Sequence, residues 1–431
     1  MIVFLMGVVS PLVLGYCLLR LFAPRLGMVA QMSIGAGIGA GVISCCFFIS
    51  LMTGLPSLLL EGLALIAAVT FCPKQRVRQV PILWTSSDKL LGVIFGLAAI
   101  AGGLAFCAQL WNQPHGGWDS FAIWNVRARF LASPLWRDSF SGFLIYSHPD
   151  YPLLLAGFIA RIWRSTGGRE LAAPALAAAL FTFGTVGVLV ASLALLKGRT
   201  QGFLAGILLL STHFFVAHGA SEYADVPVGF FILCTVAAFA LAMRYSDQPW
   251  LLVLIGLSAG LAAWTKNEGW ILIVAVAAIS LLMCRRHVRQ IALIAAGLAP
   301  VLAIILCFKI RLATANDFVS GRSLHSLVTL ISNPARYLEV GRGLLLATDF
   351  LIPVLGVAIC SLCSLRGEIS MRSTALICAV ALGIVLAGYC ATLIISPWEI
   401  QWQVRTTLNR LLLQLLPAAL FTVFLGLRKI A

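Results

Sequence analysis

The amino-acid sequence predicts an all-α membrane protein whose helices cross the bilayer many times. The chain has 431 residues, of which 61% are hydrophobic and 10% are charged, and its mean hydropathy is +1.01. A chain of this composition carries more apolar surface than the core of a soluble domain can bury. Apolar segments of about 17–25 residues, the length that crosses about 30 Å of hydrocarbon as a helix, recur from end to end. The alternating pattern of membrane-spanning strands is not found, so we expect helices throughout.

About thirteen such segments follow one another. We expect transmembrane helices near residues 2–22, 27–52, 55–72, 90–110, 170–195, 202–218, 226–243, 250–265, 270–284, 291–308, 343–365, 374–395 and 411–427. The first has no charged residue before its apolar run, and its cations, Arg20 and Arg25, follow the run. This order favours a retained helix with its N-terminus outside over a cleaved signal peptide.

The connectors between these helices indicate the orientation, because short basic connectors stay in the cytoplasm. With the N-terminus outside, the inner connectors carry Arg25, Lys74, Arg76, Arg78, Lys89, Lys197, Arg199, Arg244, Arg285, Arg286, Arg289, Arg366, Arg372, Arg428 and Lys429. Most carboxylates lie on the other side: Asp119, Asp138, Asp150, Glu170, Glu222, Asp225, Glu268, Asp317, Glu339 and Glu399. We therefore expect a multi-pass protein of the plasma (inner) membrane with its active site on the periplasmic or extracellular face.

Two regions are expected along the chain. Residues 1–89 would form an N-terminal three-helix membrane region ending in a basic cytoplasmic connector, and residues 90–431 would form the main membrane core. The expected outer loops of that core are 111–169, 219–225, 266–269, 309–342 and 396–410.

The distribution of charge and of cysteines disfavours nucleic-acid binding and a metal or redox role for the cysteines. The net charge of +15 does not indicate a nucleic-acid partner, because the cations are spread over many loops on both sides. Membrane orientation and anionic membrane lipid account for it better. The twelve cysteines all fall within predicted helices and are interpreted as small hydrophobic residues. Cys360 and Cys363 match a C-x-x-C pattern, but they lack histidine or acidic neighbours, which disfavours a metal or redox role.

The first outer loop opens with Trp118-Asp119-Ser120. The stretch 118–131 has the pattern of an amphipathic helix lying along the interface, with Arg127 and Arg129 on its polar side. A carboxylate at that depth is partly desolvated and suits a general base. Alternatively, Asp119 caps the N-terminus of the helix. The residue type alone favours neither.

Residues 151–163 are apolar but too short to span the membrane. Counting them as a span would place Lys197 outside, so we expect a juxtamembrane or re-entrant helix on the outer side. His148, just before this segment, is a candidate for ligand binding or proton relay. The alternative is that His148 anchors the turn before Pro149.

Two short outer turns carry further ionisable candidates. Glu222 and Asp225 stand one helical step apart at the mouth of two helices, and charged groups at membrane depth tend to face cavities. Asp225 is also suited to cap the following helix. In the next turn, Lys266 is a cation on the outer side against the charge rule, and it would suit an anionic ligand such as a phosphate. The alternative is an ion pair with Glu268, a kind of contact that contributes little at a surface.

The last outer segment, 396–410, leads directly into the final apolar run. Its Trp398 and Trp402, with Arg405 and Arg410, form an ordinary aromatic and cationic belt at the membrane interface.

Together these motifs resemble the GT-C class of membrane glycosyltransferases, which includes protein mannosyltransferases and aminoarabinose transferases. The resemblance spans about residues 90–427 and rests on the order of five motifs. These are Trp-Asp-Ser at 118–120, His-Pro-x-Tyr-Pro at 148–152, an acidic x-Asp-x-Pro turn at 222–227, Thr-Lys-Asn-Glu-Gly at 265–269, and Arg-Leu-Leu-Leu-Gln-Leu-Leu-Pro at 410–417.

The resemblance implies a cavity at the outer leaflet that takes a polyprenyl-phosphate sugar as donor and transfers the sugar, with inversion, to a glycan, lipid or protein acceptor. Asp119 would be the base that deprotonates or orients the acceptor hydroxyl. Lys266, with Arg405 or Arg410, would neutralise the departing lipid phosphate. The substrate-binding residues would be His148, Tyr151, Glu222, Asp225, Asn267 and Glu268.

The resemblance also bears on a metal. Related enzymes carry a paired acidic motif in the first loop, whereas here a single carboxylate is followed by Ser120. This difference disfavours a metal-bridged mechanism, although Asp119, Glu222 and Asp225 could still meet around a divalent cation. No other cofactor is expected.

Two other functions remain as alternatives. A transporter or flippase of lipid-linked saccharides would place ionisable residues at mid-membrane in broken helices and would show related halves. Here Glu61 and Asp349 are the only carboxylates inside predicted helices, apart from Glu170 at the first position of one, and neither half repeats the other. A non-catalytic assembly subunit would use the polar loops as docking surfaces.

Overall fold

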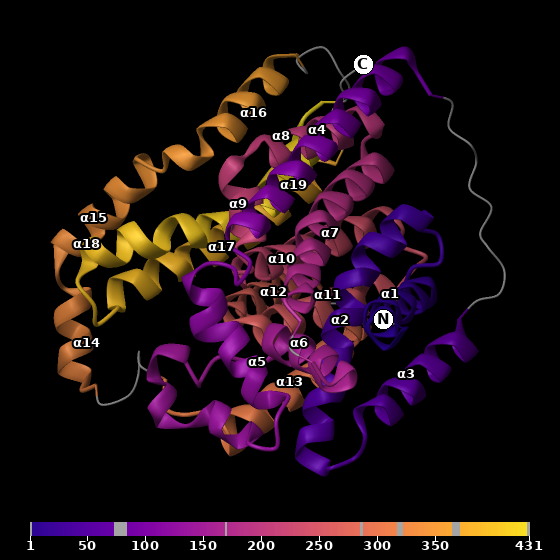
Figure 1. Cartoon of the computed structure of the whole chain (residues 1–431). Coiled ribbons are helices and arrows are strands. Elements are labelled where there is room, and N and C mark those ends of the chain that lie inside the picture. The colour runs from indigo at the N-terminus through magenta and orange to yellow at the C-terminus, as the bar shows by residue number, and fades with distance from the viewer. Residues whose placement is uncertain are drawn as a thin grey trace.

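The computed structural model describes residues 2–72, 84–168, 170–284, 288–316, 322–363 and 371–428 (Figure 1). Every regular element in these ranges is a helix. Within them, eight helices are long and apolar enough to cross a membrane, and a ninth candidate arises if one bent helix pair is a single span. The all-α, polytopic membrane fold is confirmed, whereas the count of about thirteen crossings is not.

Helices lie at all the predicted positions, but several are short. They are α1 (Ile2–Phe22), α2 (Met28–Thr53), α3 (Ser57–Phe71), α4 (Ser86–Asn112), α7 (Ala172–Leu196), α8 (Arg199–Ser211) with α9 (His213–Ala220), α10 (Asp225–Arg244), α11 (Trp250–Thr265), α12 (Gly269–Cys284), α13 (Val288–Arg311), α16 (Leu351–Cys363), α17 (Arg372–Ile395) and α19 (Asn409–Gly426). Helices α3, α11 and α12 have fewer than 18 residues, so they are not among the candidate spans.

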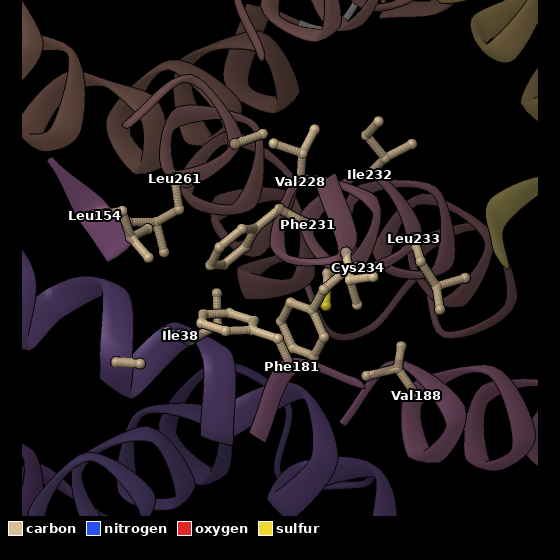
Figure 2. Packing of buried hydrophobic residues seen from close by; sticks show 14 of the residues in the cluster. Ile38, Leu154, Phe181, Val188, Val228, Phe231, Ile232, Leu233, Cys234 and Leu261 are labelled. Carbon is tan, nitrogen blue, oxygen red and sulfur yellow. The ribbon is translucent and has the colours of Figure 1, made fainter. Parts of the chain in front are cut away.

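Helix α10 lies at the centre of the molecule, with α14 (Leu324–Ile331), α15 (Pro334–Leu345) and α16 along one edge and α3 at another (Figure 1). Every side chain at 225–238 is buried, as expected for a helix that is apolar on all sides. Phe181 of α7 meets Phe231 edge-on, with ring centroids 5.7 Å apart (Figure 2). It also meets Phe230 edge-on, at 5.5 Å. This packing holds the N-terminal end of α10 in place.

The N-terminal helices pack into the core. Helix α2 contacts α6 (Leu154–Thr166), α7, α10 and α11. The guanidinium of Arg161 on α6 bonds the carboxylate of Glu61 on α3, with Nε 2.9 Å from Oε1 and 3.0 Å from Oε2. It also donates to the Gly7 carbonyl of α1 at 2.9 Å. Both charged side chains are buried, so a buried ion pair connects α1 and α3 to α6. The division of the chain at residue 89 stays a prediction.

The expected single helix at 202–218 is broken. Helices α8 and α9 meet at 67°, and Thr212 between them has an extended backbone, with φ −78° and ψ 98°. The hydroxyls of Ser211 and Thr212 both donate to the Leu208 carbonyl, at 3.0 and 2.9 Å. Hydroxyl side chains that bond backbone carbonyls in this way compete with the helix ladder.

The last predicted outer loop is largely helical. Helix α18 (Ile400–Gln403) continues through a π-helical turn, Val404–Leu408, into α19 without a break. The prediction that 396–410 is a loop was therefore wrong, because its polar residues lie on the first turns of a long helix.

The predicted loop 309–342 also contains helices, α14 and the start of α15. Arg336 of α15 donates to the carbonyls of Ile394 and Ser396 at 2.6 and 2.7 Å, which satisfies orphan carbonyls at the end of α17. Asp349, expected inside a span, lies in a short 3-10 turn, Thr348–Phe350, where Asn409 donates to it at 2.6 Å.

Contacts between turns agree with the predicted grouping of turns by side. On the predicted inner side, Arg25 pairs with Asp247, Thr200 donates to Asp88 at 3.1 Å, and Lys197 donates to the C-terminal end of α19. The absolute orientation stays a prediction. The predicted inner cations Lys74, Arg76, Arg78, Arg285, Arg286, Arg366 and Lys429, the carboxylates Asp317 and Glu368, and the side chain of Cys363 lie outside the described residues.

We expect Arg161→Met to destabilise the protein strongly, because Glu61 would be left charged and unpaired in the interior. Removing one partner of a buried ion pair costs about 3–5 kcal/mol. Thermal unfolding in detergent measures the loss, and Arg164→Met, at an exposed position on the same helix, is the control. Equal unfolding temperatures for the two variants would contradict the structural role of the pair.

Cysteine labelling tests the orientation. The Phe143 side chain on the first predicted outer loop is 98% exposed, and Ser246 is exposed in a predicted inner turn. In intact cells, a membrane-impermeant thiol reagent should label Phe143→Cys and not Ser246→Cys, with the native chain as the background control. The opposite pattern would overturn the orientation.

Candidate functional site

A buried carboxylate, Asp225, lies at the centre of a polar cluster at the start of α10. The residue is 0% exposed. Its Oδ2 accepts from Nε and Nη2 of Arg410 at 2.9 and 2.8 Å, and its Oδ1 accepts from Gln414 at 2.7 Å and from Lys266 Nζ at 3.1 Å. Both oxygens are thus occupied by side chains of the protein. The expected role of Asp225 as a helix cap is not seen, since no side-chain capping bond forms at this helix start.

The cations that bind Asp225 extend the cluster in two directions. Arg410 Nη2 also donates to Asp119 Oδ2 at 2.5 Å, and Lys266 Nζ lies 2.9 Å from Glu268 Oε1. We call this alternating series, formed by Asp119, Arg410, Asp225, Lys266 and Glu268, the ion-pair network. Burial lowers the pKa of Lys266, but the two carboxylates outweigh that effect and leave its pKa raised. Lys266 therefore stays charged, and its pair with Glu268 is not the surface contact that the sequence suggested.

The network is partly exposed at both ends, at Asp119 and Arg410 and at Glu268, and we call the end formed by Asp119 and Arg410 the open end. The side chains of Asp119 and Arg410 are 16% and 23% exposed, compared with 0% for Asp225 and 7% for Lys266. The bonds described above use Oδ2 of Asp119 and leave its Oδ1, and they use Nε and Nη2 of Arg410 and leave its Nη1. The guanidinium lies over the ring of Tyr223, 5.0 Å from the centroid. The open end thus offers one carboxylate oxygen beside one guanidinium nitrogen.

Two π-helical turns flank this open end. One, Ser120–Asn125, follows Asp119 directly, and the other, Val404–Leu408, ends two residues before Arg410. Such turns are rare in proteins overall, and those that occur are often found at functional sites. Asp119 makes no side-chain capping bond at its helix, so its carboxylate serves the ion pair and not the helix terminus.

Two glycines allow the loop before Asp119 to approach the cluster. Gly116 has φ +71°, and a Cβ there would lie 2.5 Å from Ser120 and 2.8 Å from Glu222. A Cβ on Gly117 would lie 2.4 Å from the Tyr223 hydroxyl. Any larger residue at these positions would push Asp119 away from the 222–225 turn.

Glu222 lies next to the network in the sequence turn 222–225 but forms no ion pair with its members. It is 3% exposed and adopts the left-handed backbone region, with φ +61°. Its Oε2 accepts from Ser120 Oγ at 2.7 Å and from Asn125 Nδ2 at 3.1 Å. Burial raises the pKa of the Glu222 carboxyl despite these two hydrogen bonds.

The 148–152 turn contributes a stack of aromatic rings. The Tyr151 ring packs between those of His148 and Trp124, with centroids 4.7 and 5.8 Å away. Burial raises the pKa of the Tyr151 hydroxyl; the charge of Glu268 adds to the rise, and that of Lys266 opposes it.

Arg127 differs from its predicted position. The sequence placed it on the polar side of an interfacial helix, but its side chain is 0% exposed. It donates to the Tyr151 carbonyl at 2.8 Å and lies over the Phe140 ring, 5.8 Å from the centroid. Burial lowers its pKa to about 10. The helix packs its arginine inward because the 148–152 turn supplies carbonyl acceptors.

A second cluster of polar side chains joins this turn to the 265–269 turn. Asp150 Oδ2 accepts from Asn267 and from Asn316, both at 2.7 Å. Lys309, at the end of α13, donates to the Asp150 carbonyl at 2.6 Å and to Asn267 Oδ1 at 2.8 Å. Asn267, expected to bind substrate, is thus held by the protein itself.

The structure places two further groups of residues named in the sequence analysis. Arg405 is exposed on its π-helical turn, and the ion pairs of the network come from Arg410. In the described ranges, no group of three or more His, Cys, Asp or Glu side chains is arranged to hold a metal ion. Asp119, Glu222 and Asp225 bind guanidinium, ammonium, amide and hydroxyl groups.

Sequence reasoning missed several members of the site. Gln414 binds Asp225 and accepts from the Tyr389 hydroxyl at 2.6 Å. The position of Gln414 beside Arg410 could have been predicted, because residues four positions apart lie on the same helix face. Lys309 was a cation at the end of an apolar helix on the predicted outer side. Nothing in the sequence singles out Tyr389 or Asn125.

Residues 147–310 match the family of dolichyl-phosphate-mannose-protein mannosyltransferases. The matched segment contains the 148–152 turn, Glu222, Asp225 and Lys266, whereas Asp119 and Arg410 lie outside it. No curated protein and no solved structure matches the chain. The match supports a membrane glycosyltransferase in the broad sense. Over residues 147–310 the protein thus matches a GT-C glycosyltransferase family, and the resemblance predicted from its sequence is confirmed.

Proposed function

We propose that this protein transfers a sugar from a polyprenyl-phosphate donor to a hydroxyl group of an acceptor, with inversion, at the outer face of the membrane. The observation that carries the proposal is the open end of the ion-pair network, where a carboxylate and a guanidinium lie side by side. A transfer of this kind needs one group that attracts the acceptor proton and one that stabilises the leaving phosphate. The family match adds support for this donor class, with a glycan or a protein as acceptor.

Asp119 is the proposed base. The acceptor oxygen bonds to the anomeric carbon, the bond from that carbon to the phosphate oxygen breaks, and the acceptor proton passes to Asp119. Its Oδ1 is the oxygen for this role, because Oδ2 accepts from Arg410. An attack from the face opposite the leaving phosphate inverts the anomeric centre, as in inverting glycoside chemistry.

Arg410 is the proposed phosphate ligand. Its Nη1 group is left over from the network and can donate to a phosphate oxygen, while Asp225 holds the guanidinium plane. Lys266 is only 5% exposed and bonds two carboxylates. We therefore assign Lys266 to positioning and to the local positive potential, and not to direct contact with the lipid phosphate.

The aromatic turn provides a wall for the substrate. Tyr151 lies inside the stack, between His148 and Trp124, so we assign the packing of a sugar ring to the partly exposed His148 at the end of the stack. Glu268 is the proposed ligand of a sugar hydroxyl because its side chain is 18% exposed, while its unpartnered second oxygen, Oε2, is buried.

We expect Asp119→Asn to abolish transfer and to leave folding intact. Loss of a positioned general base typically costs about 10²–10⁴-fold in rate. Transfer from polyprenyl-phosphate sugars is measured in membranes from cells that lack the native protein, after a lipid and glycan profile of such cells has identified donor and acceptor. Asp138→Asn, at an exposed position on the same loop, is the control. Full transfer by Asp119→Asn would remove Asp119 from the mechanism, and movement of a lipid-linked saccharide without transfer would favour a transporter.

We expect Arg410→Lys to lower kcat/KM about 10- to 100-fold, because a hydrogen bond to a charged group contributes about 1.5–3 kcal/mol. A lysine keeps the charge but cannot bond Asp225 through two nitrogens and reach Asp119 as well. Arg405→Lys is the matched control, since Arg405 is an exposed arginine one turn earlier. Equal losses in the two variants would show that a general basic belt, and not Arg410, handles the phosphate.

A further inference from the structure

Glu222 differs from the other buried acids of the described residues. These acids are Glu61, Asp88, Asp150, Glu222 and Asp225. The other four each have a basic side chain within 4.0 Å. Glu222 has none, and its hydrogen-bond donors are the neutral side chains of Ser120 and Asn125. An unpaired buried carboxylate is costly, and such groups commonly take up a proton instead.

Two buried oxygens in this cluster lack a donor. They are Oε1 of Glu222 and Oδ1 of Asn125. The second polar atoms of the same two side chains already form a hydrogen bond, in which Asn125 Nδ2 donates to Glu222 Oε2 at 3.1 Å. An amide and a carboxylic acid can pair head to head, with the N–H donated one way and the O–H donated back. One proton on Glu222 Oε1 would therefore satisfy both orphaned oxygens.

The π-helical turn explains why Asn125 is available for this pairing. Ser120 and Asn125 are five positions apart, which is the hydrogen-bond spacing of a π-helix, and their side chains lie close enough to bond. Asn125 Nδ2 donates to Ser120 Oγ at 2.8 Å as well as to Glu222. Asp119 directly precedes this turn. Contacts at Glu222 therefore hold the backbone that carries Asp119.

We propose that Glu222 is a protonated carboxylic acid that donates a hydrogen bond to Asn125 Oδ1, and that this neutral pair is the positioning element for Asp119. The positioning role depends on the proposed function, whereas the protonation does not. The titratable groups on the neighbouring elements are Asp119, His218, Tyr223, Asp225 and Arg410. Of these, Asp119, Asp225 and Arg410 are paired with one another. Burial raises the pKa of the Glu222 carboxyl, which agrees with a protonated side chain.

Infrared difference spectroscopy of the purified full-length protein tests the protonation. At neutral pH, the spectrum of the native protein minus that of Glu222→Gln should contain the carbonyl band of a protonated carboxylic acid. The same subtraction with Glu268→Gln should lack this band, because Glu268 is paired with Lys266. Asn125→Ala should shift the band without removing it, because the acid loses its acceptor. A carboxylate band in place of an acid band at Glu222, or no shift in Asn125→Ala, would overturn the proposal.

Stability as a function of pH provides a second readout that does not depend on sugar transfer. A folded-state pKa above the unfolded value means that the folded state binds the extra proton, so stability is full at low pH and falls as pH rises through the folded pKa. Glu222→Gln should remove this part of the fall, and Glu268→Gln should keep it. If the proposed function also holds, Glu222→Gln should retain more transfer than Glu222→Ala, because the amide still donates to Asn125. An unchanged pH dependence in Glu222→Gln would show that Glu222 is ionised in the folded protein.

Discussion

The carboxylate of Asp225 is the group on which the arrangement of the site depends. It binds Arg410 from α19 and Lys266 from the turn between α11 and α12, while its own backbone starts the buried helix α10. Without this carboxylate, two cations would face each other in a poorly solvated interior, where an uncompensated charge is expensive. Three segments that are distant in the sequence are therefore held together by one side chain.

This dependence gives the proposed catalytic pair a rigid support. Asp119 lies at the start of a short helical segment, but its partner Arg410 lies on a long helix, and Asp225 fixes the plane of the guanidinium through two nitrogens. A group aimed before the reaction starts needs no reorganisation during it, which is the condition for strong electrostatic stabilisation. The close approach of the loop at Gly116 serves the same end, since any side chain there would meet Ser120 and Glu222.

The sequence was informative about which residues gather and uninformative about how they pair. Because charged residues are scarce and the positive-inside rule sorts the turns, Asp119, Asp225, Lys266 and Arg410 could be assigned to one face without a structure. The sequence could not show that Arg410, and not Arg405, joins the network, because this depends on the helical phase set by a π-turn. The inward direction of Arg127 could not be predicted either, because its acceptors lie 21 and 24 positions further along the chain. The predicted number of crossings is not confirmed, because several apolar helices are short and one pair is bent, and composition does not reveal either feature.

The cost of burying an acid explains how this chain uses its carboxylates. Glu61 is paired with Arg161 and joins the N-terminal helices to the core, where its contribution is structural. Asp225 accepts four hydrogen bonds, from Arg410, Lys266 and Gln414, and organises the site. Glu222 has no cation and only neutral donors, so a proton is the one remaining way to offset its burial. The cost of burying a charge is thus met in three ways. Glu61 has an arginine and a structural role, Asp225 has two cations and organises the site, and Glu222 has a proton and is neutral.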